Sequence, residues 1–365
     1  MGIYLVLYLF AILYNAMCRT VSIKRAQAVD TALKNQRKNY VISAGIFLMI
    51  YLLLALRHPS MGNDLGYHNN YGYLAIFDRI TATQWHDIFG GARFQHYEPG
   101  YVFLNKLLGV FSTNWQVFLA FMAFISLLPF HIVIKNESKN VLMSWFVFLG
   151  LPIFLLIYSG LRQTIAIGIC FLAFPFIKKK KLIPALLLIV LASLFHESSL
   201  LFALSYPAYW LPIKRNARMI TPVVLLCVFM FKGPLLNAIG SLLGLNIDID
   251  NNGAFIFFAF LMMIYIFCML LSDGEKETEG MLNILFLACF CQAFSSLNSI
   301  VARTGFYFLP ILTLLLPKVL NTIKDGKMRF VLKAAVYTGF ILYGLFSIQT
   351  TQWACAYPYR FFWSK

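Results

Sequence analysis

The sequence predicts an all-α, polytopic integral membrane protein with about 11–13 transmembrane helices. Hydrophobic residues make up 60% of its 365 positions and charged residues only 12%, whereas soluble domains are about 45–50% apolar and about 25% charged. Apolar segments also follow one another with only short polar breaks, and roughly 20 apolar residues are enough for a helix to cross a bilayer core. We therefore expect a single transmembrane domain over residues 1–365, with a long outer loop at 57–100.

The apolar pattern predicts twelve spans, near residues 2–18, 39–56, 115–134, 141–158, 160–177, 182–195, 198–212, 219–232, 254–271, 281–297, 305–320 and 331–349. The first span lacks a preceding basic residue and a small-residue cleavage site, so we expect a retained helix rather than a cleaved signal peptide. The three spans between 182 and 232 are short for a crossing, and we expect them to be tilted, kinked or re-entrant. The segment 101–111 is too short to span, and we expect it either to lie at the membrane interface or to enter the bilayer part way.

Basic residues predict the orientation of these spans, because short loops rich in Lys and Arg stay on the cytoplasmic side. Alternate loops, beginning with 19–38, hold 21 of the 30 basic residues, and the clusters at 178–181 and 214–218 are the densest. Both termini are then expected outside. Topology accounts for most of the net charge of +16, so we expect anionic lipid headgroups rather than nucleic acid to contact the cytoplasmic cations.

Three predicted outer turns carry polar residues beside apolar helices. Arg162 and Gln163 lie in "IYSGLRQTIAIGIC", His196 lies in "FHESSL" and Arg303 lies in "NSIVARTG". Placing a charged residue at the edge of the bilayer core costs free energy unless the residue faces a cavity or a partner. The charged residues at these turns therefore favour a functional site. The alternative is that Arg162 snorkels to the interface and anchors the end of a helix.

The outer loop adds carboxylates and aromatic rings to this side. Asp64 and Tyr67 lie in "NDLGYHNNYGYL", and Tyr97 and Glu98 lie in "FQHYEPGYVF", where Gly and Pro break any continuous helix. Tyr beside Asp, Asn and His is typical of a sugar-binding surface, since the rings stack on sugars and the polar groups bond hydroxyls. Alternatively, the rings form an interfacial aromatic belt.

Several segments together resemble the EpsG family of bacterial membrane proteins, which belongs with the Wzy-type O-antigen and exopolysaccharide polymerases. They follow the same order across most of the chain, and the Arg-Gln pair with the later Phe-His-x-Ser-Ser is their most specific part. The segments are "SGLRQTIAIGIC" (159–170), "LFHESSLLFALSYP" (194–207), "NDLGYHNNYGYL" (63–74), "YEPGYVFLNKL" (97–107) and "YPYRFF" (357–362).

The resemblance implies a membrane glycosyltransferase of the bacterial inner membrane, with a fold similar to the lipid-linked-sugar (GT-C-like) transferases and an active site facing the periplasm. Separately, we expect the enzyme to be metal-independent. It implies that a growing glycan moves from undecaprenyl diphosphate to an incoming lipid-linked repeat unit. The partners it implies are the undecaprenyl diphosphate-linked oligosaccharide, the lipid bilayer and a separate chain-length regulator. No nucleic acid and no cofactor are expected.

The candidate residues have chemistry that suits this implied reaction. The guanidinium groups of Arg162 and Arg303 are expected to bind the departing diphosphate through forked hydrogen bonds. His196, Asp64 and Glu98 are the candidates for the general base that takes the proton of the attacking hydroxyl. His196 is the first choice, because an imidazole exchanges protons near neutral pH.

Gln163, Tyr67 and Tyr97 complete the predicted substrate site as sugar contacts, and no metal site is predicted. The sequence has no P-loop and no dinucleotide fingerprint, which argues against an ATP-driven pump or a redox enzyme. Two alternatives remain. A lipid-linked oligosaccharide transporter (flippase) is expected to bury charges near the membrane midplane, and a membrane acyltransferase acting on the same glycan would use His196 as its base.

Overall fold

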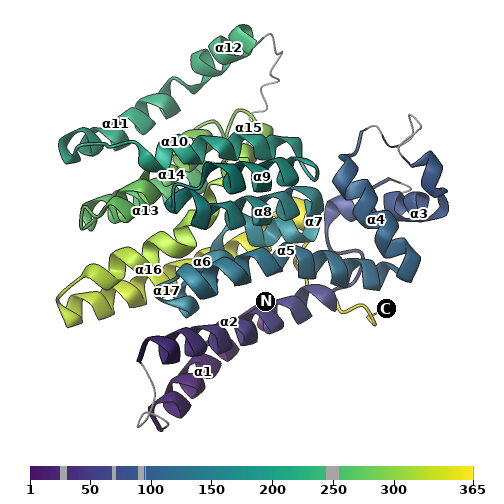
Figure 1. Cartoon of the computed structure of the whole chain (residues 1–365), viewed down its shortest axis with the longest axis horizontal. Coiled ribbons are helices and arrows are strands. Elements are labelled where there is room, and N and C mark those ends of the chain that lie inside the picture. Colours follow the sequence, from purple (N-terminus) through teal and green to yellow (C-terminus); the bar gives the residue numbers. More distant parts are fainter. Residues whose placement is uncertain (25–30, 68–70, 89–93, 95, 244–254, 365) are drawn as a thin grey trace.

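The computed structural model describes residues 1–24, 31–67, 71–88, 94, 96–243 and 255–364 (Figure 1). In these residues the chain is all-helical, as the sequence predicts, and the strand-type pairing there amounts to one isolated antiparallel bridge between Arg57 and Phe361. The long helices lie side by side, and two short helices, α3 (Tyr73–Ala82) and α4 (Pro99–Phe111), gather at one end of them (Figure 1).

The helices have the following bounds. The long ones are α1 Gly2–Lys24, α2 Thr31–Ala55, α5 Trp115–Glu137, α8 Leu161–Lys178 and α17 Gly326–Thr350. The other α-helices are α6 Val141–Gly150, α7 Pro152–Ser159, α9 Leu182–Ser193, α10 Ser205–Trp210, α11 Arg215–Met230, α12 Lys232–Leu243, α13 Phe255–Leu270, α14 Lys276–Gln292, α15 Ser299–Thr304 and α16 Leu312–Thr322. Short 3-10 helices lie at η1 Asn63–Leu65, η2 Trp85–Asp87, η4 Glu197–Leu204, η5 Gly305–Tyr307, η6 Leu309–Ile311 and η7 Gln352–Ala354.

Within the described residues, five helices are long and apolar enough to cross a membrane, or up to eight spans if each bent helix pair counts as one. The five are α1, α2, α5, α8 and α17, and α9 and α13 are shorter apolar helices. A polytopic, all-helical membrane protein is therefore confirmed. The twelve predicted spans are not all continuous helices: the segment predicted at 198–212 forms η4 followed by the short α10, because its serines and Pro207 disfavour a continuous α-helix.

Proline and glycine set the breaks between α6, α7 and α8. Pro152 opens α7, and α6 and α7 meet at a bend of 60°. Proline has no backbone N–H to continue the hydrogen-bond ladder of the preceding helix. Gly160 then separates α7 from α8. The second break places Arg162 in the first turn of α8.

Polar side chains cap the starts of four helices. Asn114 and Asp325 each accept hydrogen bonds from two first-turn N–H groups, at the starts of α5 and α17. Asn140 does the same for α6 with one N–H group, and Asn298 for α15 with two. A side-chain cap of this kind stabilises a helix by about 1 kcal/mol. The polar breaks in the sequence are therefore also the signals that start these helices.

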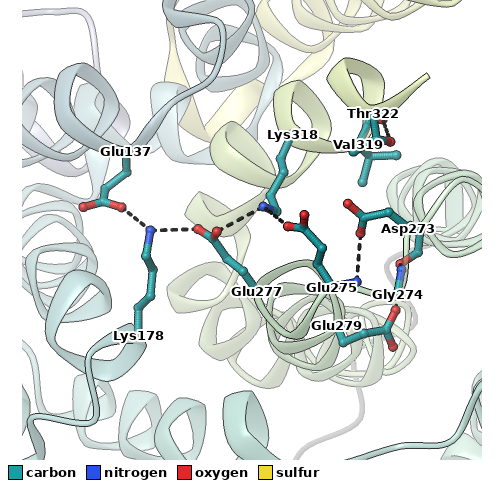
Figure 2. Close-up of polar contacts among 11 residues, drawn as sticks. Glu137, Lys178, Asp273, Gly274, Glu275, Glu277, Glu279, Lys318, Val319 and Thr322 are labelled. Carbon is teal, nitrogen blue, oxygen red and sulfur yellow. Dashed lines mark hydrogen bonds and ion pairs between the residues drawn. The ribbon is translucent and has the colours of Figure 1, made fainter. Parts of the chain in front are cut away.

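Two lysines and three glutamates form a chain of ion pairs at one end of the bundle (Figure 2). Lys178 Nζ donates to Glu137 Oε2 at 2.7 Å and to Glu277 Oε1 at 2.8 Å. Lys318 Nζ donates to Glu277 Oε2 at 3.0 Å and to Glu275 Oε2 at 2.8 Å. The chain joins the ends of α5, α8 and α14 to α16. We call this end of the helices the basic end.

The opposite end is covered by the segment predicted as a long outer loop, and we call it the site end. This segment contains α3 and leads into α4, which includes the segment 101–111. Both helices pack on the starts of α5 and α8 through a second apolar cluster, in which the rings of Phe77 and Phe118 stack at 4.7 Å between centroids. The packing gives the outer segment a fixed position on the helices that carry the site.

The C-terminal tail pairs with Arg57 at the site end through the backbone bridge to Phe361. The buried Arg57 guanidinium donates from Nη1 to the carbonyl oxygen of Ile157, in the last turn of α7, at 3.0 Å. A cation is favourable there because the carbonyl groups at a helix C-terminus carry partial negative charge. Tyr4 of α1 donates to the carbonyl oxygen of Ala356 at 2.6 Å. The two ends of the chain therefore lie together.

Candidate active site

A backbone contact holds Glu98 beside the turn that follows α9. Glu98 precedes α4 as its N-cap residue, and Pro99 takes the first helical position, which suits a residue without an N–H group. Gly100 N then donates to the carbonyl oxygen of Leu194 at 2.9 Å. A Cβ atom on Gly100 would lie 2.7 Å from that oxygen, so only glycine permits the approach. The Glu-Pro-Gly sequence thus brings Glu98 to His196.

The Glu98 carboxylate joins Arg162 and His196, and we call these three residues the Glu98 cluster. Oε2 accepts from Arg162 Nη1 at 2.5 Å, and Oε1 pairs with His196 Nδ1 at 3.0 Å. The Glu98 side chain is only 9% exposed, against 23% for Arg162 and 31% for His196. The carboxylate is therefore the most deeply buried member, and the guanidinium and the imidazole are more accessible to a ligand.

The electrostatics of the cluster determine which nitrogen of His196 carries a proton. Burial raises the pKa of the Glu98 carboxyl, but the hydrogen bond with His196 and the charge of Arg162 outweigh this effect and hold the pKa below its ordinary value of 4.5. The carboxylate is thus ionised at neutral pH and can only accept hydrogen bonds. His196 Nδ1 must then be the donor. In the neutral ring, Nε2 is the nitrogen that can take a proton.

Two tyrosine rings lie against Arg162. The guanidinium carbon is 5.1 Å from the ring centroid of Tyr97 and 6.0 Å from that of Tyr73, within the range of cation–π attraction. These rings and Glu98 fix the orientation of a long, flexible side chain. A guanidinium has five N–H donors, so the pairing with Glu98 leaves donors for an anionic ligand.

Gln163 and Arg303 meet through the backbone of α15. Gln163 Nε2 donates to the carbonyl oxygen of Arg303 at 3.0 Å, and Gln292 Nε2 donates to the carbonyl oxygen of Ala302 at 2.6 Å. The Arg303 guanidinium carbon lies 5.6 Å from the ring centroid of Trp353. Since α15 also contacts η4, Arg303 lies near the turn that carries His196. Gln163 positions the segment that carries Arg303, and its contact with sugar stays a prediction.

Asp64 and Tyr67 lie on or just after η1, on another part of the site end. The Asp64 side chain is exposed, and the contacts of Arg162 and His196 described above are with Glu98 rather than with Asp64. The backbone N–H of Asp64 donates to Ser159 Oγ at 3.1 Å. The Tyr67 ring packs edge-on against His58 and Trp115, at 5.1 Å and 6.1 Å between centroids. The base role of Asp64 and the sugar contact of Tyr67 therefore stay predictions.

Three aromatic residues adjoin the site without having been singled out from the sequence. Tyr73 flanks Arg162, Trp353 flanks Arg303, and Tyr307 accepts a hydrogen bond from Ser198 Oγ at 3.1 Å. Tyr73 lies in the same aromatic stretch as Tyr67, and Tyr307 follows Arg303 by about one helical turn. These spacings are signals that would have identified both. Nothing in the sequence pairs the tail residue Trp353 with Arg303.

The arrangement can exchange a proton close to a bound anion. Glu98 orients the His196 ring, as a carboxylate does for the histidine of a catalytic triad, while Arg162 offers a permanent positive charge beside it. Within the part of the chain that the structure describes, no group of three His, Cys, Asp or Glu side chains is placed to hold a metal ion.

Comparison with known proteins gives one family match. The model of the EpsG family matches residues 40–361, a range that includes every residue of the Glu98 cluster. No curated protein and no solved structure matches the chain.

Proposed function

The chain belongs to the EpsG family, and from that premise we propose that it is a membrane polysaccharide polymerase that joins lipid-linked repeat units on the outer face of the bacterial inner membrane. Family membership supports a polysaccharide polymerase-type role in general. The observation that carries the specific reaction is the Glu98 cluster, in which an oriented imidazole lies beside a guanidinium at the site end.

In the proposed reaction, a hydroxyl of the incoming lipid-linked repeat attacks the anomeric carbon of the growing glycan. A new glycosidic C–O bond forms, and the bond between that carbon and the diphosphate oxygen breaks. The bonding electrons leave with undecaprenyl diphosphate. His196 Nε2 takes the hydroxyl proton as general base, a role that contributes about 10²–10⁴-fold to a rate. Glu98 acts as a positioning residue through Nδ1.

Arg162 and Arg303 stabilise the negative charge that develops on the departing diphosphate in this proposal. A preorganised cation stabilises such charge more in a partly desolvated site than in water. Arg162 is held by Glu98 and Tyr97, and Arg303 by its contact with Trp353. Tyr97 and Gln163 lie nearby as candidate contacts for sugar. Tyr67, on another part of the site end, is a third candidate.

The position of the cluster favours a transferase over a transporter. Arg162 lies in the first turn of α8 and Glu98 precedes α4, so the charged groups are at the ends of helices. A transporter is expected to hold its substrate near the midplane instead.

Reconstituted vesicles test the proposal. The purified full-length chain is given lipid-linked repeat units on the accessible face, and glycan length and free undecaprenyl diphosphate are both measured. We expect one lipid diphosphate released for each new linkage. Movement of intact lipid-linked repeats across the vesicle membrane without release would indicate a transporter, and transfer of an acyl group to the glycan would indicate an acyltransferase.

A further inference from the structure

A cavity of about 160 Å³ lies at the basic end, far along the helices from the Glu98 cluster. It is lined by the start of α11, the end of α13 with the turn that follows it, and the first turn of α14; the lining residues are Ile213, Arg215, Arg218, Met219, Met269, Ser272, Gly274 and Glu279. Gly274 and Glu279 appear in Figure 2 next to the ion-pair chain. Pockets for drug-sized ligands have volumes of about 300–1,000 Å³, so this cavity suits a single small headgroup.

Arg218 lines this cavity, and one of its donors has no hydrogen-bond partner in the part of the chain that the structure describes. The side chain is only 3% exposed, and its Nε lies 2.5 Å from Glu279 Oε2. Nη2 donates to Asn283 Oδ1 at 2.8 Å, whereas Nη1 is buried with no hydrogen-bond partner among the described residues. A buried donor left without a partner costs about 1–3 kcal/mol. An acceptor bound in the cavity would remove that cost.

The other charged groups at the cavity also favour the binding of an anion. Glu279 is the one acidic side chain among the lining residues and is already bonded by Arg218 and by Ser272 Oγ, the latter at 2.7 Å. The exposed Arg215 adds a second positive charge at the first position of α11. The preceding residue, Lys214, gives no side-chain cap to this helix start. N–H groups at a helix N-terminus bind anions, and the helix dipole adds to the attraction.

Apolar side chains beside the cavity indicate the source of the anion. Met219, Ile220 and Val223 on α11 are 48%, 58% and 58% exposed. They follow directly along the helix from the two arginines. In a bilayer these side chains would contact acyl chains while Arg215 and Arg218 lie at headgroup level, where basic residues attract anionic lipids.

We propose that the cavity at Arg215 and Arg218 binds the phosphate headgroup of an anionic phospholipid of the leaflet at the basic end. The headgroup phosphate accepts from Arg218 Nη1, from Arg215 and from the first-turn N–H groups of α11. The lipid chains lie along the apolar face of α11. This site is separate from the proposed polymerase site and does not depend on the reaction carried out there.

A lipid titration tests this site. The purified full-length chain in detergent micelles is titrated with phosphatidylglycerol, and the shift in its thermal unfolding midpoint reports binding to the folded state. Arg215→Ala is expected to need about tenfold more lipid for the same shift, because it removes one charge-assisted contact. Lys327→Ala removes an exposed cation at the start of α17, outside the cavity, and is expected to behave as the parent chain does.

A second variant and a second ligand identify what binds in the cavity. Arg215→Glu is expected to weaken the response to phosphatidylglycerol more than Arg215→Ala does, because it places a second carboxylate at the cavity. Equal responses of the parent chain and both variants would overturn the proposal. Inorganic phosphate is titrated in parallel, and a shift as large as that given by the lipid at the same concentration would show that a soluble anion is the ligand and overturn the lipid assignment.

Discussion

At the scale of single residues, the Glu98 carboxylate has two partners, and each one favours its ionised form. The pKa of this carboxyl is below 4.5 in the folded chain. A lowered carboxyl pKa means that the stabilisation is fully present above the unfolded pKa and is lost as pH falls through the folded pKa. The carboxylate therefore contributes to stability throughout the neutral range.

Glu98→Gln tests this linkage. We expect the variant to be less stable than the parent chain by about 2 kcal/mol at pH 7, since it loses charge-assisted hydrogen bonds. The difference is expected to shrink as pH falls below 4.5. Thermal unfolding midpoints between pH 7 and pH 3.5 measure it. Glu197→Gln, which changes the exposed carboxyl next to His196, is the matched control, and a pH-independent Glu98→Gln deficit would contradict the ion-pair account.

At the scale of elements, the approach of α4 to the turn after α9 decides whether Glu98 reaches His196. The contact depends on Gly100, since a Cβ atom there would lie 2.7 Å from the Leu194 carbonyl oxygen and 2.8 Å from Leu194 Cβ. Both distances are below those of ordinary atomic contacts, so an alanine must push the two segments apart.

Gly100→Ala is therefore expected to reduce polymer synthesis by roughly 10²-fold, because small displacements of catalytic groups are costly. The chain should still insert and fold. Gly339→Ala lies within α17, where nothing is within 4 Å of the new Cβ, and serves as the control with activity equal to the parent. Parental activity in Gly100→Ala at equal membrane levels would show that the approach of α4 is not required.

The ion-pair chain at the basic end holds the ends of α5, α8 and α14 against α16. Lys178→Met leaves Glu137 and Glu277 without their shared lysine. We expect a loss of about 2 kcal/mol of stability, between the values of ~1 kcal/mol for exposed pairs and about 3–5 kcal/mol for buried ones. A lower thermal unfolding midpoint reports it. Lys181→Met changes an exposed lysine three residues away, and an equal loss in both variants would mean that the ion pairs contribute nothing specific.

The sequence predicts much of this element structure and less of the site. Apolar periodicity and composition identify the helices, and the polar breaks identify Arg162, His196 and Arg303, because each is conspicuous among apolar neighbours. The pairing of Glu98 with both Arg162 and His196 depends on a contact between residues about 94 positions apart (Gly100 and Leu194), which local patterns do not encode. The Arg303–Trp353 contact depends likewise on where the tail packs.

At the scale of the whole molecule, the lysine-rich turns and the candidate site lie at opposite ends of the helices. The lysine-rich turns and the ion-pair chain (Figure 2) lie at the basic end. The Glu98 cluster, Arg57 and the C-terminal tail lie at the site end, and the C-terminus is marked in Figure 1. With the positive-inside rule, this separation predicts that the site end faces outward.

Labelling with a membrane-impermeant maleimide tests that orientation. In spheroplasts carrying a background chain whose seven cysteines are all replaced by serine, Tyr357→Cys in the tail is expected to react, since Tyr357 is 42% exposed. Lys179→Cys at the basic end is expected to react only after the membrane is permeabilised. The reverse pattern would mean that the site end faces the cytoplasm.

The central claim is that the Glu98 cluster lengthens a glycan. Its most direct test is the glycan ladder from cells that lack the chromosomal copy and express the parent chain, His196→Ala, Glu98→Gln or the control His86→Ala, whose ring is exposed on η2, at matched membrane levels. We predict long glycans with the parent and His86→Ala, and single repeat units with the two cluster variants. A full-length ladder from His196→Ala, or failure of repeat units to reach the outer face without the chain, would contradict the account.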